Sequence, residues 1–329
     1  MYAPATNKVL LEDNNGSQML KSKKSDTKIY NFMKGLYHSR YLYLLIVPVI
    51  VYYFIFHYIP MYGVIIAFKD FNAFKGILGS PWAGFKHFKA FFESPFAYRL
   101  IRNTLTINIY DLVVGFPAPI ILALLINEVK SNRFKRSVQT IVYMPHFISV
   151  VVVCGMLISF LSPSTGIINR FIQMLGGNPI HFLAEPRWFK TVYVLSGVWQ
   201  SAGWGSIIYL AALAGIEMEL YEAATVDGAT KWQKLIYVTL PGILPTIIIM
   251  LILRMGRMFT VGFEKIMLLY NPLTYETADV ISTYVYRKGI LEANYSYTAA
   301  IGLFNSVINF IMLVTFNKFS RKVSEISLW

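Results

Sequence analysis

One group of aromatic, amide and hydroxyl side chains interrupts a long apolar stretch of the sequence. Gln200, Ser201 and Trp204 lie within five residues and directly follow Trp199. Ligand pockets are lined by aromatic side chains with a few placed polar groups, and aromatic rings can stack on sugar rings while amides and hydroxyls bond their hydroxyl groups. The group therefore predicts contacts with a sugar, and helix–helix packing is the alternative for each member.

Two arginines, Arg254 and Arg257, occur near the end of another apolar stretch. A guanidinium group inside a membrane is costly without a partner, and a spacing of three residues predicts that both lie on one helix face. Asp111, from a third apolar stretch, would neutralise one of them in an interhelical salt bridge. Carboxylates of an acidic sugar are the other candidate, because arginine binds a carboxylate through two parallel hydrogen bonds.

A third polar set falls in the last apolar stretch. Thr298, Gly302, Asn305 and Asn309 are spaced four, three and four residues apart, which predicts one helix face. Polar residues in a membrane segment are candidates for a substrate pathway. Hydrogen bonding between helices explains Asn305 and Asn309 equally well.

The sequence offers no site for nucleotide hydrolysis or metal binding. The nearest approach to a phosphate-binding loop runs from Gly79 to Gly84, but Phe85 stands where the motif requires lysine. The five histidines show no metal-site spacing, and the single cysteine, Cys154, cannot form an internal disulfide. We expect no enzymatic activity, no catalytic residue and no bound metal or other cofactor on this chain.

The composition is that of a membrane protein. Of 329 residues, 56% are hydrophobic and only 14% are charged, with a mean hydropathy of +0.51. A soluble domain carries about 25% charged residues, so a soluble enzyme, a disordered scaffold and a secreted disulfide domain are excluded. The net charge of +13 is better explained by basic cytoplasmic loops than by nucleic-acid binding.

Six apolar runs have about the 20 residues that a helix needs to cross a bilayer. No alternating pattern suggests a barrel, so an all-α integral membrane fold of six transmembrane helices is predicted. The predicted spans are Tyr41–Ile59, Thr104–Ile126, Val138–Leu161, Thr191–Ile216, Ile243–Phe263 and Ala299–Phe316.

Both polar ends of the chain are predicted to be cytoplasmic. Residues 1–40 form an N-terminal tail, residues 41–316 the membrane domain and residues 317–329 a C-terminal tail. An even number of spans places both ends on one side, and the basic cluster at residues 130–136 favours the cytoplasm. Lysines and arginines between the first two spans oppose this orientation, so charge favours it only weakly.

The loop at residues 217–242 holds the most specific pattern in the chain. Its small residues allow close contact with another protein surface, and Gly228 suits a sharp turn between two helices. Pro241 lacks a backbone donor and is expected to block helix continuation. The pattern is Glu222-Ala223-Ala224, two further residues, Asp227-Gly228-Ala229, and a stretch that closes in Leu240-Pro241.

This pattern resembles the EAA loop of ABC importer permeases, and the chain is most similar to the maltose-type oligosaccharide (carbohydrate uptake) permeases. Only Leu235 and Val238 depart mildly from it. The resemblance implies a type I ABC importer permease fold in a bacterial cell membrane. It implies a loop seated in a cleft of an ATPase, so that ATP and Mg bind to that partner and closure of the ATPase moves the membrane helices.

The resemblance also implies partners and substrate contacts. The partners are a second permease subunit, usually a different chain, two cytoplasmic ATP-binding subunits and an extracytoplasmic solute-binding protein. Substrate contacts are implied near Gln200, Ser201 and Trp204 and near Phe259 and Thr260 on the fifth helix. The function predicted is oligosaccharide import, extending to acidic pectin- or alginate-derived fragments. An integral-membrane scaffold or assembly protein with a similar loop remains the alternative.

Overall fold

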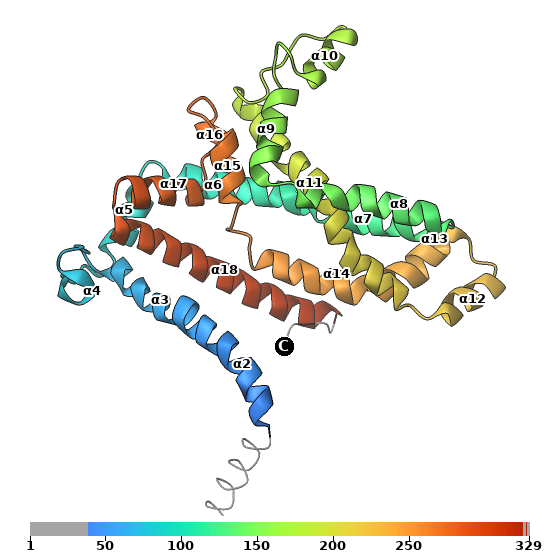
Figure 1. Cartoon of the computed structure of the whole chain (residues 1–329), viewed down its shortest axis with the longest axis horizontal. Helices are drawn as coiled ribbons and strands as arrows, with labels where there is room; N and C mark the ends of the chain where they lie inside the picture. The colour runs from blue at the N-terminus through green and yellow to red at the C-terminus, as the bar shows by residue number, and fades with distance from the viewer. Residues whose placement is uncertain (1–38, 325–326, 328–329) are drawn as a thin grey trace, which may run out of the picture. The chain divides into compact units, whose positions relative to one another are not determined.

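The described part of the chain is almost entirely helical. The computed structural model describes residues 39–324 and 327 (Figure 1). Most of the predicted N-terminal tail and the last part of the predicted C-terminal tail lie outside these residues. The α-helices of the first half are α2 (Arg40–Tyr53), α3 (Ile59–Met61), α4 (Gly76–Gly79), α5 (Lys86–Glu93), α6 (Ala97–Tyr110), α7 (Pro117–Asn127), α8 (Asn132–Tyr143), α9 (Val150–Phe160) and α10 (Ile167–Met174).

Short 3₁₀ and π-helical segments occur in both halves of the chain, and the longest α-helices lie in the second half. Shorter 3₁₀ segments are η2 (Tyr62–Phe68) and η4 (Met144–Phe147), and π-helical turns are η1 (Phe54–Tyr58), η3 (Asp111–Gly115), η5 (Leu235–Thr239) and η6 (Arg287–Leu291). The α-helices are α11 (Pro186–Ala214), α12 (Met218–Val226), α13 (Lys231–Lys234), α14 (Leu240–Met255), α15 (Phe263–Leu269), α16 (Tyr275–Ala278), α17 (Ile281–Tyr286) and α18 (Tyr295–Ser324).

Four continuous helical stretches in the described residues are long and apolar enough to cross a membrane. A fifth span is obtained if the stretches Asn132–Phe147 and Val150–Phe160, bent by 98°, are counted together. The prediction of an all-helical membrane protein is confirmed, whereas the count of six is not. The four are Arg40–Phe68, Ala97–Asn127, Lys231–Met255 and Tyr295–Lys322.

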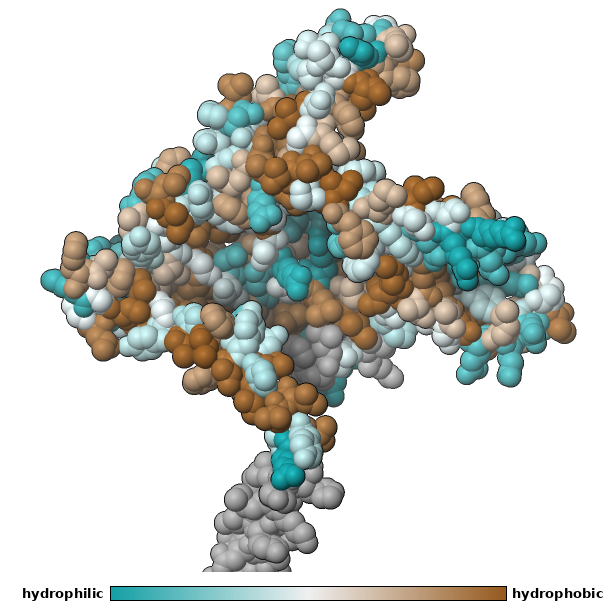
Figure 2. All heavy atoms as spheres, viewed as in Figure 1, coloured by the Kyte–Doolittle hydropathy of each residue, from teal (hydrophilic) through white to brown (hydrophobic). Residues whose placement is uncertain are grey.

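The described residues fall into two compact units, residues 39–63 and the rest of the chain from residue 64. The first unit is the apolar helix α2 with its continuation through η1 and α3, and its side chains are exposed along their length. In the second unit, hydrophilic residues gather over the ends of α8 and α13, while hydrophobic residues cover α9 (Figure 2). This separation is expected of a chain with water-facing and lipid-facing regions.

Two predicted spans were wrong as single helices. The stretch 138–161 is interrupted at Ile148 and Ser149, which are extended, and the Ser149 side chain caps α9 by accepting the Val152 N–H at 3.4 Å. The stretch 243–263 ends its helix at Met255, and residues 257–262 are not in an α-helix. The first break occurs because the Ser149 side chain starts a new helix. The second lies between two glycines, Gly256 and Gly262, which weaken helical geometry.

Three π-helical turns are each followed closely by a proline. η1, η3 and η5 each end two residues before Pro60, Pro117 and Pro241, respectively. A proline ring collides with the carbonyl four residues earlier, and a π-helical turn widens the helix there. Pro241 therefore does not end the helix, contrary to the prediction, since the helical stretch continues from Lys231 to Met255.

Helix α11 packs along α7 and also contacts α8 and α14. Tyr209 and Leu213 of α11 share a buried cluster with Ala123 of α7 and Ile243 of α14. Gly203 lies directly against the backbone carbonyl of Val142 in α8, so that a Cβ atom at this position would collide with it. Close backbone approach through a small residue is a common way for membrane helices to associate.

Replacing this glycine should therefore disrupt the bundle. We expect Gly203→Val to destabilise the folded protein by about 2 kcal/mol, because the backbone of α8 has to move. Gly302→Val is the matched control, since no atom lies within 4 Å of the Cβ it would add. The thermal unfolding midpoint of each purified variant measures the effect, and an unchanged midpoint for Gly203→Val would contradict this packing.

Candidate functional site

A polar cavity of about 810 Å³ lies among α6, α11 and the segment that follows α14. A second cavity of about 420 Å³ adjoins it and shares Asp111, Ser201 and Arg254 with the first. Charged side chains from α14, α15 and η3 reach the first cavity, and Trp204 and Arg257 line the second. The polar residues of the first are Asn108, Asp111, His146, Tyr193, Gln200, Ser201, Arg254, Thr260, Glu264 and Lys265.

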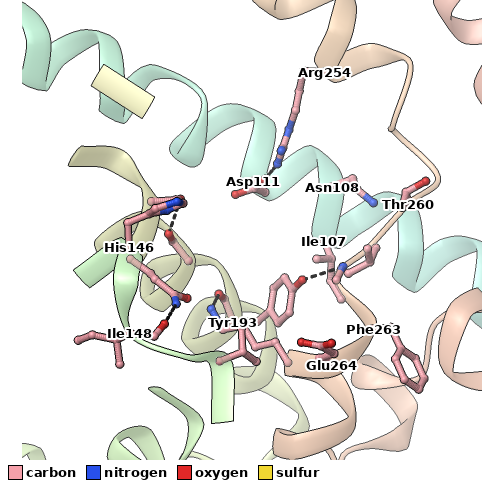
Figure 3. Close-up of a pocket in the computed structure, with 17 residues that line it drawn as sticks. Ile107, Asn108, Asp111, His146, Ile148, Tyr193, Arg254, Thr260, Phe263 and Glu264 are labelled. Atoms are coloured by element: carbon pink, nitrogen blue, oxygen red, sulfur yellow. Dashed lines mark hydrogen bonds and ion pairs between the residues drawn. The ribbon is translucent and has the colours of Figure 1, made fainter. Parts of the chain in front are cut away.

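The non-helical segment after α14 is held by side chains of two other helices. Asn309 of α18 accepts the Phe259 N–H at 2.9 Å and donates to the Thr260 hydroxyl at 3.1 Å. The Tyr193 hydroxyl of α11 accepts the Gly262 N–H at 3.1 Å (Figure 3). Backbone groups released from a helix need such partners, so Asn309 has a structural task here.

The resemblance had implied that Phe259 and Thr260 lie on the fifth helix. In the structure they belong to this non-helical segment instead. Thr260 lines the large cavity, whereas the Phe259 side chain packs against a buried apolar cluster that includes Tyr284 and Ile301. The structure thus brings only Thr260 of this pair to the cavity.

Arg254 and Asp111 form an ion pair across the cavity wall. Their side chains point toward one another from α14 and η3 (Figure 3). Gly115 makes room for this pair, because a Cβ atom there would collide with the Asp111 carboxylate. Among the described residues, Arg257 has no ion pair, and it lies beyond the end of α14, so the two arginines do not share a helix face, although both line the second cavity.

The polar group on α11 makes contacts within the protein. The Gln200 side-chain amide donates to the Ile148 carbonyl at 2.9 Å and so holds the bend before α9. The Ser201 hydroxyl donates to the Gly197 carbonyl at 2.6 Å, and the Trp204 ring stacks on the His146 ring at a centroid distance of 4.7 Å. Gln200 and Ser201 still line the large cavity, and Ser201 reaches both.

Asn305 lies apart from these two cavities. It lines a separate hollow of about 430 Å³ between α17 and α18. Its side-chain oxygen is buried and has no hydrogen-bond partner among the described residues. The structure therefore does not bring Asn305 together with Gln200 or Arg254.

Two charged residues at the cavity were missed by reasoning from the sequence. Glu264 and Lys265 open α15, and both line the large cavity. Burial lowers the pKa of the Lys265 ammonium to about 8. Lys265 sits outside every predicted span, and the only sequence signal for it was two adjacent charges directly after an apolar run.

The loop at residues 217–242 folds as two short helices joined by a tight turn. Gly228 has φ +74°, and the Ala229 N–H reaches the Ala224 carbonyl while the Gly228 N–H reaches that of Thr225. This is the Schellman pattern that ends a helix with a left-handed glycine. Thr230 and Gln233 then form a capping box that starts α13.

Side-chain contacts fix the two short helices to each other. The Tyr221 and Thr239 hydroxyls lie 3.0 Å apart, and the Lys234 ammonium donates to the Thr225 hydroxyl at 2.7 Å. Five residues of the predicted pattern, Glu222, Ala223, Asp227, Gly228 and Pro241, are exposed, and Ala224, Ala229 and Leu240 are half-buried. Exposed apolar side chains surround them, namely Met218, Leu220, Val226, Trp232 and Tyr237. Exposed apolar side chains beside a tight turn are what a protein contact would use.

Within the described residues, no group of three or more histidine, cysteine, aspartate or glutamate side chains is placed to hold a metal ion. The fold and the site define an all-helical membrane transport subunit with a polar cavity between its helices and an exposed helical loop. Residues 115–325 match the family described as binding-protein-dependent transport system inner membrane component. The chain belongs to this family.

Two relatives are similar to this chain over most of its length. The chain is 44% identical over 299 residues to Protein LplB of Bacillus subtilis (strain 168), which covers 91% of this chain and 94% of that protein. It is 42% identical over 290 residues to the polygalacturonan/rhamnogalacturonan transport system permease protein YteP of the same organism, with 88% and 90% covered.

A solved structure agrees with these relatives. The chain is 46% identical to a chain in the crystal structure of a bacterial ABC transporter involved in the import of the acidic polysaccharide alginate, with a TM-score of 0.83, and the match covers 89% of this chain and 99% of that one. The resemblance to ABC importer permeases is confirmed. The protein is a permease subunit of an ABC oligosaccharide importer in the cytoplasmic membrane, and ATP hydrolysis belongs to a separate subunit.

The ion pair between Arg254 and Asp111 predicts a coupled effect on stability. Asp111→Asn and Arg254→Gln should each lower the thermal unfolding midpoint, because each leaves one charge without its partner. The double variant should lose less than the two single losses together, with a coupling of about 1 kcal/mol. Arg257→Gln is the control and should leave the midpoint unchanged. Strictly additive losses would show that the pair contributes nothing.

Proposed function

We propose that this permease conducts acidic oligosaccharides through the cavity beside α11. The observation that carries the proposal is the charge of the two adjoining cavities, in which Arg254, Arg257 and Lys265 meet two acids, Asp111 and Glu264. Because Asp111 already neutralises Arg254, a carboxylate-bearing cargo would find unpaired cations there. The names of relatives that transport polygalacturonan and alginate support the same class.

The polar side chains of the cavity wall suit a sugar chain. Ser201 and Thr260 offer hydroxyl groups, and Gln200 offers the oxygen of its amide, whose nitrogen is bonded to Ile148. One face of the Trp204 ring is covered by His146, so we assign Trp204 the wall of the smaller cavity. Asn309 acts by holding the segment that carries Thr260, and we assign no cargo contact to Phe259 or Asn305.

We propose six membrane spans, with α11 as the one not recognised by its composition. α11 has 29 residues and packs against α7, α8 and α14, each of which belongs to a candidate span. Ser201 faces the cavity and Gln200 holds the bend, and such polar side chains lower the hydropathy of α11 without removing it from the bundle. Six spans would place both chain ends on the same side of the membrane as the loop at residues 217–242. Because that loop would face a cytoplasmic ATPase, both chain ends would be cytoplasmic.

The complete importer requires partners. We propose a second permease subunit of different sequence, two cytoplasmic ATP-binding subunits and an extracytoplasmic solute-binding protein. The family name includes a binding protein, and a related structure contains an alginate pentasaccharide-bound periplasmic protein. Glu222, Asp227 and Gly228 lie on the exposed side of the coupling loop, where an ATPase would bind.

Cargo preference tests the proposed substrate class. The assembled importer in proteoliposomes should take up a uronate trisaccharide at least about ten-fold faster than its neutral, carboxyl-methylated form, because a charge-assisted hydrogen bond is lost in the ester. Both sugars are supplied on saturating binding protein, and the loading of that protein is checked by calorimetry. Equal uptake of the two cargoes would refute an acidic substrate class.

The coupling loop yields a separate prediction. Gly228→Val should abolish uptake and cargo-stimulated ATP hydrolysis, because valine is strained at φ +74° and the turn between α12 and α13 must change. Gly76→Val is the matched control, since Gly76 has φ +67° and open space around it but lies far from this loop in the chain. The control should retain uptake. Normal coupling in a well-assembled Gly228→Val importer would exclude this role for the turn.

A further inference from the structure

Building on the proposed function, we infer that Lys265 is the residue that recognises the cargo carboxylate. Lys265 lines the large cavity, yet the residue is only 8% exposed. No carboxylate among the described residues lies within ion-pair distance of its ammonium group, as the ion pairs of residues 39–324 all involve other side chains. A buried cation on a cavity wall is stabilised by an anion that enters the cavity.

The immediate surroundings hold the ammonium in place without neutralising it. Its nitrogen donates to the Tyr193 carbonyl at 2.9 Å and lies 5.0 Å from the centre of the Tyr193 ring. An ammonium group has three donors, so these contacts leave hydrogen-bonding capacity for a ligand. Both contacts come from one residue of α11, which fixes the direction from which the lysine approaches the cavity.

Gly197 keeps one side of the ammonium open. It lies one helical turn after Tyr193 and also lines the cavity. A Cβ atom at position 197 would lie 3.5 Å from the Lys265 nitrogen, and no other atom would lie within 4 Å of it. The space that a side chain would fill is therefore free beside the charge. A carboxylate oxygen of the cargo can reach the ammonium through that space.

The two arginines are less suited to this role. Arg254 already has the Asp111 carboxylate as its partner, so a cargo would have to compete with it. Arg257 is exposed and lines only the second cavity, where water screens its charge. Lys265 combines burial with a missing partner, and a charge pair formed in a poorly solvated place is stronger than one formed in water.

Glu264 precedes Lys265 and provides a built-in control. Its side chain is exposed on the same cavity and carries the opposite charge. If only the net charge of the cavity matters, removing the Lys265 charge should lower uronate uptake and removing the Glu264 charge should raise it by a similar factor. If Lys265 binds the carboxylate directly, only the lysine should be required, and removing Glu264 should leave uronate uptake equal or higher.

The experiment measures uptake by the assembled importer in proteoliposomes, with the uronate trisaccharide and its carboxyl-methylated form. Lys265→Met should lower uronate uptake about ten-fold and leave uptake of the methylated form at the wild-type rate. Lys265→Arg, which retains the charge, should keep most of the uronate uptake. Glu264→Gln should not lower it. Lys265→Met is expected to assemble, because the Tyr193 carbonyl also accepts from the Ser196 hydroxyl.

Two results would overturn this assignment while leaving the proposed function intact. One is wild-type uronate uptake by Lys265→Met, in an importer that still prefers uronate over the methylated form. The other is an equal fall for both cargoes, which would assign Lys265 a purely structural role. A wild-type importer with no preference between the cargoes would instead refute the acidic substrate class itself, so the two failures are distinct.

Discussion

The cavity depends on how the bundle satisfies the backbone between Gly256 and Gly262. This segment leaves helical geometry at the end of a membrane-crossing helix, where free N–H groups are costly. Asn309 of α18 and Tyr193 of α11 supply the missing partners, and they join three helices at one point. The break also turns the chain into α15, which places Lys265 on the cavity wall.

Several polar side chains of the bundle are used by the fold itself. Gln200 holds the bend at Ile148, Asn309 holds the broken segment, and Asp111 neutralises Arg254. A polar residue with an internal partner contributes shape and rigidity to a pathway. Recognition of a ligand falls to groups whose charge the fold leaves uncompensated, and Lys265 is the buried example among the described residues.

Apolar length and the loop pattern predicted the helical membrane fold and the helix–turn–helix form of residues 217–242 well, because both depend on local sequence. The pairing of Arg254 with Asp111 was foreseen as one of two alternatives, since charge opposition is visible in the sequence. The broken fifth helix was not foreseen, because its hydropathy continues past Met255 and the capping partners come from distant helices. Lys265 was missed for the same reason, as its burial arises only when α11 packs beside it.

We propose that acidic cargo occupies the cavity beside α11 and is bound there by Lys265. The most direct measurement is a cryo-EM structure of the assembled importer, halted during ATP hydrolysis in the presence of a uronate oligosaccharide. We expect sugar density in the cavity between Ser201 and Thr260, with a carboxylate beside the Lys265 ammonium and Gly197. Sugar density that passes along another face of the chain, with this cavity closed by side chains, would contradict it.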